Sequence, residues 1–195
     1  PKIIIRFKSK EKEYFLYIGK KKNGLYYAKN SKKPYIFLLE EGIIDNIPDE
    51  INEIRERKLF GFNVSEVAEF SIIKKYKELK FIKEKDIYYL EKDRKKKISK
   101  DKVEDFLHDL KNLEIKDFIE FSEENLKKFS LLTPNIKIKV FDGKVKTEIY
   151  FGEKTENWLY CFHPERKIIF TLPSSDYIKI DKDENFFIEK EEKKK

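Results

Sequence analysis

The side chains for thiol or imidazole chemistry are few in this sequence: one cysteine and two histidines. Cys161 and His163 stand two residues apart in a strand-like run, so both point to one face, and a cysteine–histidine pair is one interpretation of the spacing. We favour the other interpretation, in which the cysteine packs as a small apolar side chain. His108 belongs to a helical stripe, and neither histidine has further ligands at zinc-site spacing. We therefore expect no catalytic site, no metal and no cofactor.

A phosphate-binding loop is a second candidate, at Tyr17–Asn30, where glycine, three lysines and a second glycine follow a strand-like run. The GxxxxGK[ST] pattern of such a loop is absent, and a similar layout returns at Tyr150–His163 without the lysine triplet. We interpret Gly19 and Gly152 as strand-end glycines with positive φ, and residues 20–24 as a polar hairpin loop.

The charges of the chain, 44 basic and 37 acidic residues, are mostly interspersed. Acidic residues flank the basic run at 94–97 and no nucleic-acid motif is present, so we expect no nucleic-acid binding. The acidic run at 181–185 lacks the glycine and distal glutamate of a calcium-binding loop, and we interpret it as the start of a charged, disordered tail at 181–195. No stretch approaches the roughly 20 apolar residues that cross a bilayer, so we expect no direct membrane insertion.

An internal repeat supplies the elements that would position any site. A shift of 133 residues places Pro1–Leu39 on Pro134–Leu172 without a gap and with ten identities. Each copy has four short β-branched or aromatic runs with polar connections, which predicts a four-stranded antiparallel meander. We therefore expect a duplicated unit of meander plus helices that is cut in mid-repeat at both ends, and the missing initiator methionine also indicates a fragment.

The segment between the two copies supplies the helices. Apolar residues at helical spacing predict a helix near 101–114, and Asp101 and Glu104 resemble a capping box at its start. Ser122 is placed to cap another helix near 122–130. The buried stripe of the first of these helices is expected to consist of Val103, Phe106, Leu107, Leu110 and Leu113.

Strands and helices occupy separate stretches, which is typical of the α+β class. A short helix is predicted to begin at Pro48 with Ile51, Ile54 and Leu59 available for burial, and three strands are predicted at 67–92. This order divides the chain into the second half of a first repeat, a second repeat with its meander at 134–172, and a tail, at 1–60, 61–180 and 181–195.

Three stretches carry a resemblance to a known family. EIRERKLFGFNVSEVAEFSI at 53–72 resembles the hinge of a bacterial domain-of-unknown-function family, catalogued as four-three-four-zero. IYYLEKD at 87–93 resembles its short strand before a helix, where a tryptophan is usual, and NLKKFSLLTPNIKIKV at 125–140 resembles a later passage, with Ser130 in place of a common glycine. The resemblance implies an envelope protein with one N-terminal membrane anchor, often encoded beside ABC transporter components of the gliding-motility type. It carries over no catalytic residue.

These observations favour a non-catalytic extracytoplasmic accessory domain, anchored by an upstream segment outside this chain and associated with a membrane-protein or transporter partner. The alternative is a ligand-, sugar- or peptide-binding module that uses an aromatic-rich sheet surface, with Tyr26, Tyr27, Trp158 and Tyr160 as its contacts. Because alternation puts Trp158 on the same face as Tyr160, we also expect Trp158 and its counterpart Leu25 to point inward.

Overall fold

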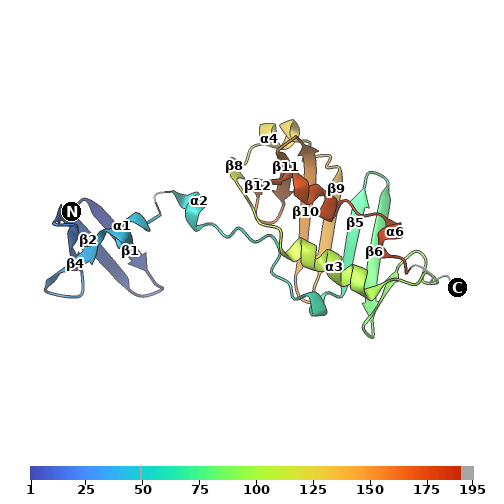
Figure 1. Ribbon diagram of the computed structural model, residues 1–195, viewed down its shortest axis with the longest axis horizontal. Coiled ribbons are helices and arrows are strands. Elements are labelled where there is room, and N and C mark those ends of the chain that lie inside the picture. The colour runs from blue at the N-terminus through green and yellow to red at the C-terminus, as the bar shows by residue number, and fades with distance from the viewer. Residues whose placement is uncertain (49, 190–195) are drawn as a thin grey trace. The chain divides into compact units, whose positions relative to one another are not determined.

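The chain forms two units, Pro1–Arg55 and Glu56–Lys195, in a computed structural model that describes residues 1–48 and 50–189. Each unit is built on its own antiparallel sheet with short helices, which confirms the α+β class (Figure 1). The boundary lies between Arg55 and Glu56, slightly before the expected end of the first part at residue 60.

The sheet of the first unit is a meander in which each strand pairs antiparallel with the next. Its strands are β1 (Ile3–Lys8), β2 (Glu13–Lys22), β3 (Leu25–Asn30) and β4 (Ile36–Glu40). Asn23 and Gly24 both have positive φ and close a two-residue turn between β2 and β3. The lysine triplet therefore belongs to the end of β2, and the loop expected at 20–24 is shorter than predicted.

Two short helices, α1 (Glu41–Asp45) and α2 (Ile51–Ile54), follow the first meander. The expected burial of Leu59 is confirmed, at 1% exposure, but the expected burial of Ile51 and Ile54 in a helix that begins at Pro48 is wrong. The helix begins at Ile51, and the two isoleucines are 70% and 68% exposed because α2 packs no apolar side chain into a core.

The second unit contains an eight-stranded antiparallel sheet in the order β7-β6-β5-β9-β10-β11-β12-β8. The three strands predicted at 67–92 are β5, β6 and β7, and β5 joins them to the second meander by pairing with β9. The strands are β5 (Glu69–Lys74), β6 (Lys77–Glu84), β7 (Ile87–Leu90), β8 (Phe118–Ile119), β9 (Ile136–Phe141), β10 (Lys146–Lys154), β11 (Trp158–His163) and β12 (Ile168–Pro173).

Helix α3 (Lys100–Lys111) lies across one face of this sheet, here named the inner face (Figure 1). The predicted stripe from Val103 to Leu113 is fully buried against the strands. The helix begins one residue earlier than expected, and its N-cap is Ser99, whose Oγ accepts a hydrogen bond from the N–H of Lys102 at 3.4 Å. The capping box expected from Asp101 and Glu104 is therefore wrong.

Three shorter helices complete the second unit, α4 (Glu123–Lys128), α5 (Tyr177–Ile180) and α6 (Glu184–Phe187), with 3-10 turns at Val64–Glu66 and Ser174–Asp176. As predicted, Ser122 caps α4 by accepting a hydrogen bond from the N–H of Asn125 at 3.1 Å.

The C-terminal segment belongs to the core of the second unit. Phe187 of α6 is fully buried, and its ring centroid lies 4.7 Å from that of Phe81. Asp183 caps this helix, so the acidic run that was interpreted as the start of a tail starts an apolar helix instead. The expected disorder is wrong for 181–189, and the rest of the expected tail, 190–195, lies outside the described residues.

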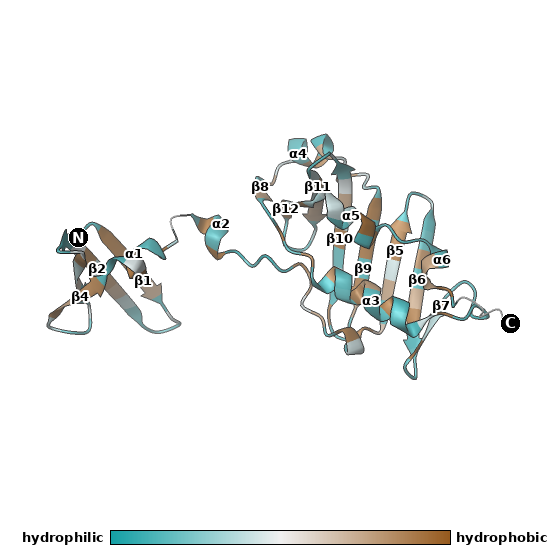
Figure 2. Cartoon of the chain, in the orientation of Figure 1, coloured by the Kyte–Doolittle hydropathy of each residue, from teal (hydrophilic) through white to brown (hydrophobic). Residues whose placement is uncertain are grey.

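The two sheets share their pairing at the offset found in the sequence. Ile3 pairs with Ile18 in the first sheet, and their counterparts Ile136 and Phe151 pair in the second. The pairing of β2 with β3 shifts register directly after Ile18, and the pairing of β10 with β11 shifts register at the equivalent place, directly after Phe151. Helix α2 falls on α6 at this offset too, and apolar residues line the strands of both sheets (Figure 2).

Candidate functional site

Cys161 and His163 share the inner face of β11, but each makes a separate structural contact. The fully buried Sγ–H of Cys161 donates to the carbonyl oxygen of Leu159 at 3.4 Å, and burial raises the pKa of the thiol. Nδ1 of His163 accepts the backbone N–H of Arg166 at 3.5 Å. Burial, and then the charge of Arg166, lower the pKa of His163 to about 4. A protonated thiol is a poor nucleophile, so this pair has the properties of core residues.

No metal centre is formed by the side chains that the structure describes. His108 is exposed on α3, whereas His163 is buried at the end of β11. Within residues 1–48 and 50–189, no group of three or more histidine, cysteine, aspartate or glutamate side chains is placed to hold a metal ion.

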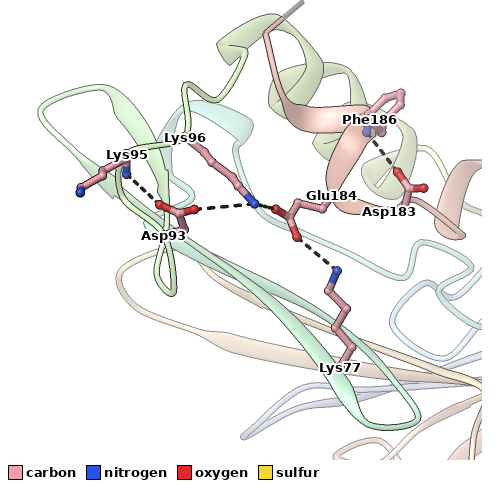
Figure 3. A network of polar contacts seen from close by, with 7 residues as sticks. All are labelled: Lys77, Asp93, Lys95, Lys96, Asp183, Glu184 and Phe186. Carbon is pink, nitrogen blue, oxygen red and sulfur yellow. Dashed lines mark hydrogen bonds and ion pairs between the residues drawn. The ribbon is translucent and has the colours of Figure 1, made fainter.

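A cluster of charged residues ties α6 to the edge of the second sheet (Figure 3). Glu184 accepts a hydrogen bond from Nζ of Lys77 at 3.2 Å and also pairs with Lys96, which lies 3.7 Å from Asp93. Hydrogen bonds from Lys96 and Lys77 lower the pKa of Glu184, and the same carboxylate raises the pKa of Lys96. A carboxylate that stays ionised in this way is suited to holding the helix rather than to acid catalysis.

The four aromatic residues considered as ligand contacts belong to two separate units. Tyr26 and Tyr27 lie on β3 of the first unit, and Trp158 and Tyr160 lie on β11 of the second. Tyr160 is half-buried beneath Phe129, with parallel rings whose centroids are 4.0 Å apart. Each unit therefore contains two of these residues, and the ring of Tyr160 is already stacked against Phe129.

Trp158 does not point into the core, so the expectation of an inward side chain is wrong. It is 37% exposed at the first position of β11, and its counterpart Leu25 is half-buried. Alternation does place Trp158 with Tyr160, but their face is the outer one, opposite the face that α3 covers. Leu159, the residue between them, enters the core instead.

Gly19 and Gly152 have ordinary backbone angles, so the expected positive φ is wrong for both. A Cβ added to Gly152 would lie 2.2 Å from the carbonyl oxygen of Phe129, because the chain that leaves α4 presses on β10 at this point. A Cβ added to Gly19 would have the carbonyl oxygen of Tyr27 as its nearest neighbour, at 3.4 Å. The reason for glycine at 152 is a close approach of backbone, not a turn.

An open hollow of about 560 Å³, here named the outer hollow, lies where the β5–β6 turn meets the segment that leads into β9. It combines apolar surface with two lysines and has no acidic side chain in its lining. Its residues are Ile73, Lys75, Tyr76, Leu132, Thr133, Pro134, Asn135 and Lys137.

The outer hollow exposes an aromatic ring and an apolar side chain beside two cationic groups. Tyr76 is fully exposed at the tip of a turn held by the positive φ of Lys75, and Leu132 is 53% exposed. Nζ of Lys137 lies 4.8 Å from the ring centroid of Tyr150, which extends the aromatic and cationic surface. Such a surface fits a polypeptide segment that carries apolar and acidic side chains.

The outer hollow was not predicted from the sequence, because its residues come from two segments separated by more than fifty positions. Two local signals were present. The stretch IIKKYKEL predicts two strands with a tight turn whose tyrosine has no apolar neighbour at strand spacing, and LLTPN places an apolar side chain beside a proline at the entrance to a strand. Neither signal shows that the two stretches meet.

Comparison with known proteins assigns the chain to a family. The family model described as "Domain of unknown function (DUF4340)" matches residues 1–124 and again residues 89–194. Searches of curated proteins and of solved structures gave no match. No helix within the described residues is long and apolar enough to cross a membrane. The matched residues include most of the chain, and the chain therefore belongs to the DUF4340 family of domains of unknown function.

Proposed function

We propose that the chain is a non-catalytic accessory domain that binds another protein through the outer hollow. The observation that carries this proposal is the exposure of Tyr76 and Leu132 beside two lysines in a lining without acidic groups. The groups that could do chemistry have other roles. Cys161 and His163 are buried, and Glu184 is held by lysines.

The partner is a membrane protein, and the domain works on the extracytoplasmic side, tethered by a membrane segment ahead of Pro1. The support for this part is the resemblance of the sequence to envelope proteins encoded beside ABC transporter components. The partner's contact segment carries apolar and acidic side chains, because Lys75 and Lys137 flank the apolar surface of the hollow.

The two sheets are copies of one duplicated unit. Three features support the duplication: the pairing of Ile3 with Ile18 and of Ile136 with Phe151, the register shift that follows in both sheets, and the coincidence of α2 with α6. In a repeat, equivalent strands and helices are expected to lie the same number of residues apart, because each copy keeps the loop lengths that set the register.

A ligand-, sugar- or peptide-binding module is the second candidate. The exposure of Trp158 and Tyr27, 37% and 42%, favours it, since an exposed aromatic ring is a platform for a sugar or a peptide side chain. The stack of Tyr160 beneath Phe129 weighs against it, because one of the four proposed contacts is already covered.

Site-specific photo-crosslinking in the full-length, membrane-anchored protein separates these two functions. A crosslinking residue at Tyr76 should capture one membrane protein, and Lys137→Glu should abolish the adduct by repelling the acidic segment. The same residue at Ile178, 73% exposed on α5, is the matched control and should give no adduct. Equal adducts at both positions, or an adduct that survives Lys137→Glu, would contradict the proposal. Loss of oligosaccharide binding in Trp158→Ala would favour the second candidate.

A further inference from the structure

The inner face of the first unit is only partly covered by the described residues of that unit, which bury Ile18 and Ala28 and leave the other inner positions half-buried or exposed. In the second sheet the inner positions are Ile136, Ile138, Val140, Ile149, Phe151, Leu159, Cys161, Phe170 and Leu172. Their counterparts in the first sheet are all apolar too: Ile3, Ile5, Phe7, Leu16, Ile18, Tyr26, Ala28, Phe37 and Leu39. The two faces therefore have the same pattern, and a matching cover would suit both.

Exposure differs most at two pairs of counterparts, one at the edge of the sheet and one in the helix that follows it. Phe7 is 55% exposed, whereas Val140, which has α3 and β5 beside it, is 2% exposed. Ile54 of α2 is 68% exposed, whereas Phe187 of α6 is fully buried. Apolar surface of this kind in a sheet of four strands indicates an interface that is filled in the working protein.

The edge of the first sheet is open where the edge of the second is paired. Strand β9 pairs with β10 on one side and with β5 on the other. Its counterpart β1 pairs with β2, and the described residues provide no strand for its other side. An unpaired edge beside exposed apolar residues is a template for strand addition.

Gly19 is an independent sign of a second missing contact, on the outer face, because Phe129 and Leu131 lie on that face of the second sheet. Its counterpart Gly152 is required by the backbone at Phe129, in the segment that ends the helical half of the second unit. Gly19 is required neither by a positive φ nor by any such contact, although a glycine weakens a strand. A glycine at this position suits a segment that approaches β2 as residues 129–131 approach β10.

We propose that the inner face and the β1 edge of the first unit bind a segment of the same polypeptide ahead of Pro1, folded as residues 56–133 fold in the second unit. A strand like β5 pairs with β1, a helix like α3 covers Phe7, and a turn like 129–131 packs on Gly19. The inference rests on the proposed duplication. It does not depend on the partner at the outer hollow.

The fit of the counterparts shows that this segment is a relative of residues 56–133 and not an identical copy. Phe7 and Tyr26 are larger than Val140 and Leu159, whereas Ile18 is smaller than Phe151. Because these exchanges change the shape of the face, the side chains that pack against it have to differ as well. The segment therefore follows the apolar pattern of residues 56–133 with different residues.

Hydrogen exchange tests the proposal in two proteins, the 195-residue chain and the full-length protein with the residues encoded ahead of Pro1. The amides of β1 should exchange at least about tenfold more slowly in the full-length protein, because a paired edge opens only with its domain. Gly19→Ala should leave the exchange of β1 unchanged in the 195-residue chain and should reverse the protection in the full-length protein. Gly42→Ala is the matched control, because its Cβ meets no atom within 4 Å, and should be neutral in both.

Three results would overturn the proposal: equal exchange of β1 in the two proteins, Gly19→Ala tolerated in both, or a gene that encodes no such segment. Light scattering of the 195-residue chain tests whether a second copy of the chain occupies this face instead. A dimer with slowly exchanging β1 amides would show that a second copy fills this face, and would also overturn the proposal. Loss of the partner at the outer hollow would change none of these readings.

Discussion

Acid should weaken the second unit because a buried histidine has to remain neutral in the folded protein. His163 is 3% exposed at the end of β11, and burial lowers its pKa from 6.5 to about 4. The unfolded chain exposes this ring, so it takes up a proton at a pH where the folded chain does not. The stabilisation is therefore complete above the unfolded pKa of 6.5 and is lost as the pH falls towards the folded pKa of about 4.

The expected size follows from the distance between the two pKa values. Complete passage through both would cost roughly 3 kcal/mol, and the part lost between about pH 7 and about pH 5 is about 2 kcal/mol. Carboxylates contribute to the same pH range, so the wild-type curve alone does not isolate the histidine. His163→Gln removes only the titrating group, and His108→Gln removes the exposed histidine of α3 as a matched control.

Urea unfolding followed by the fluorescence of Trp158 measures the effect in the three proteins at both pH values. The wild type and His108→Gln should lose about 2 kcal/mol more than His163→Gln on acidification. Any loss of stability that His163→Gln causes at neutral pH cancels, because the comparison is between pH values within one protein. A His163→Gln variant as acid-sensitive as the wild type would refute the link between burial and the pKa.

Cys161 should stay unmodified by a thiol reagent in the folded protein and react in urea, because it is buried and its pKa is raised; rapid labelling of the native chain, read by mass spectrometry, would contradict this. Gly152→Ala should lower the free energy of unfolding by about 1 to 3 kcal/mol, since its Cβ would overlap the carbonyl oxygen of Phe129. Gly19→Ala in the 195-residue chain should change the free energy of unfolding of the first unit by less than about 0.5 kcal/mol, measured in urea by circular dichroism because Trp158 reports the second unit alone, and a cost equal to that of Gly152→Ala would disprove the contact. Glu184→Gln should cost less than about 1 kcal/mol, because its ion pairs are partly exposed. The Glu184 contribution is complete above an ordinary glutamate pKa and is lost as the pH falls through its lowered pKa, so this variant should lose less stability in acid than the wild type.

Local periodicity was sufficient for the elements that carry it strongly. The stripe from Val103 to Leu113 has helical spacing, and the structure buries all of it, the first four residues in α3 and Leu113 just after its end. The offset of 133 residues also placed the strands of both meanders correctly, because the loops between them have matching lengths and loop length sets the register. These features depend on residues close together in the sequence.

Features that depend on another segment were not predictable in the same way. Every residue of WLYCFH except His163 is apolar or aromatic, so alternation alone does not tell which face of β11 is the core, and the packing of α3 decides it for Leu159. The role of Gly152 depends on the backbone at Phe129, and the acidic run at 181–185 looked like a tail until the burial of Phe187 was known. Each of these errors arose where a distant contact overrode the local pattern.

The uneven burial of the two units determines how stability in this chain has to be measured. Among the described residues of the first unit, Ile18 and Ala28 are the apolar side chains that are fully buried, whereas the second unit has one large core. Two units with such different cores are expected to unfold in separate steps. The one tryptophan, Trp158, belongs to the second unit and reports that step alone, whereas the exchange of β1 amides reports the first. Coincident transitions by these two probes would show that the units unfold together, and the open face of the first unit would then have to be satisfied within the chain itself.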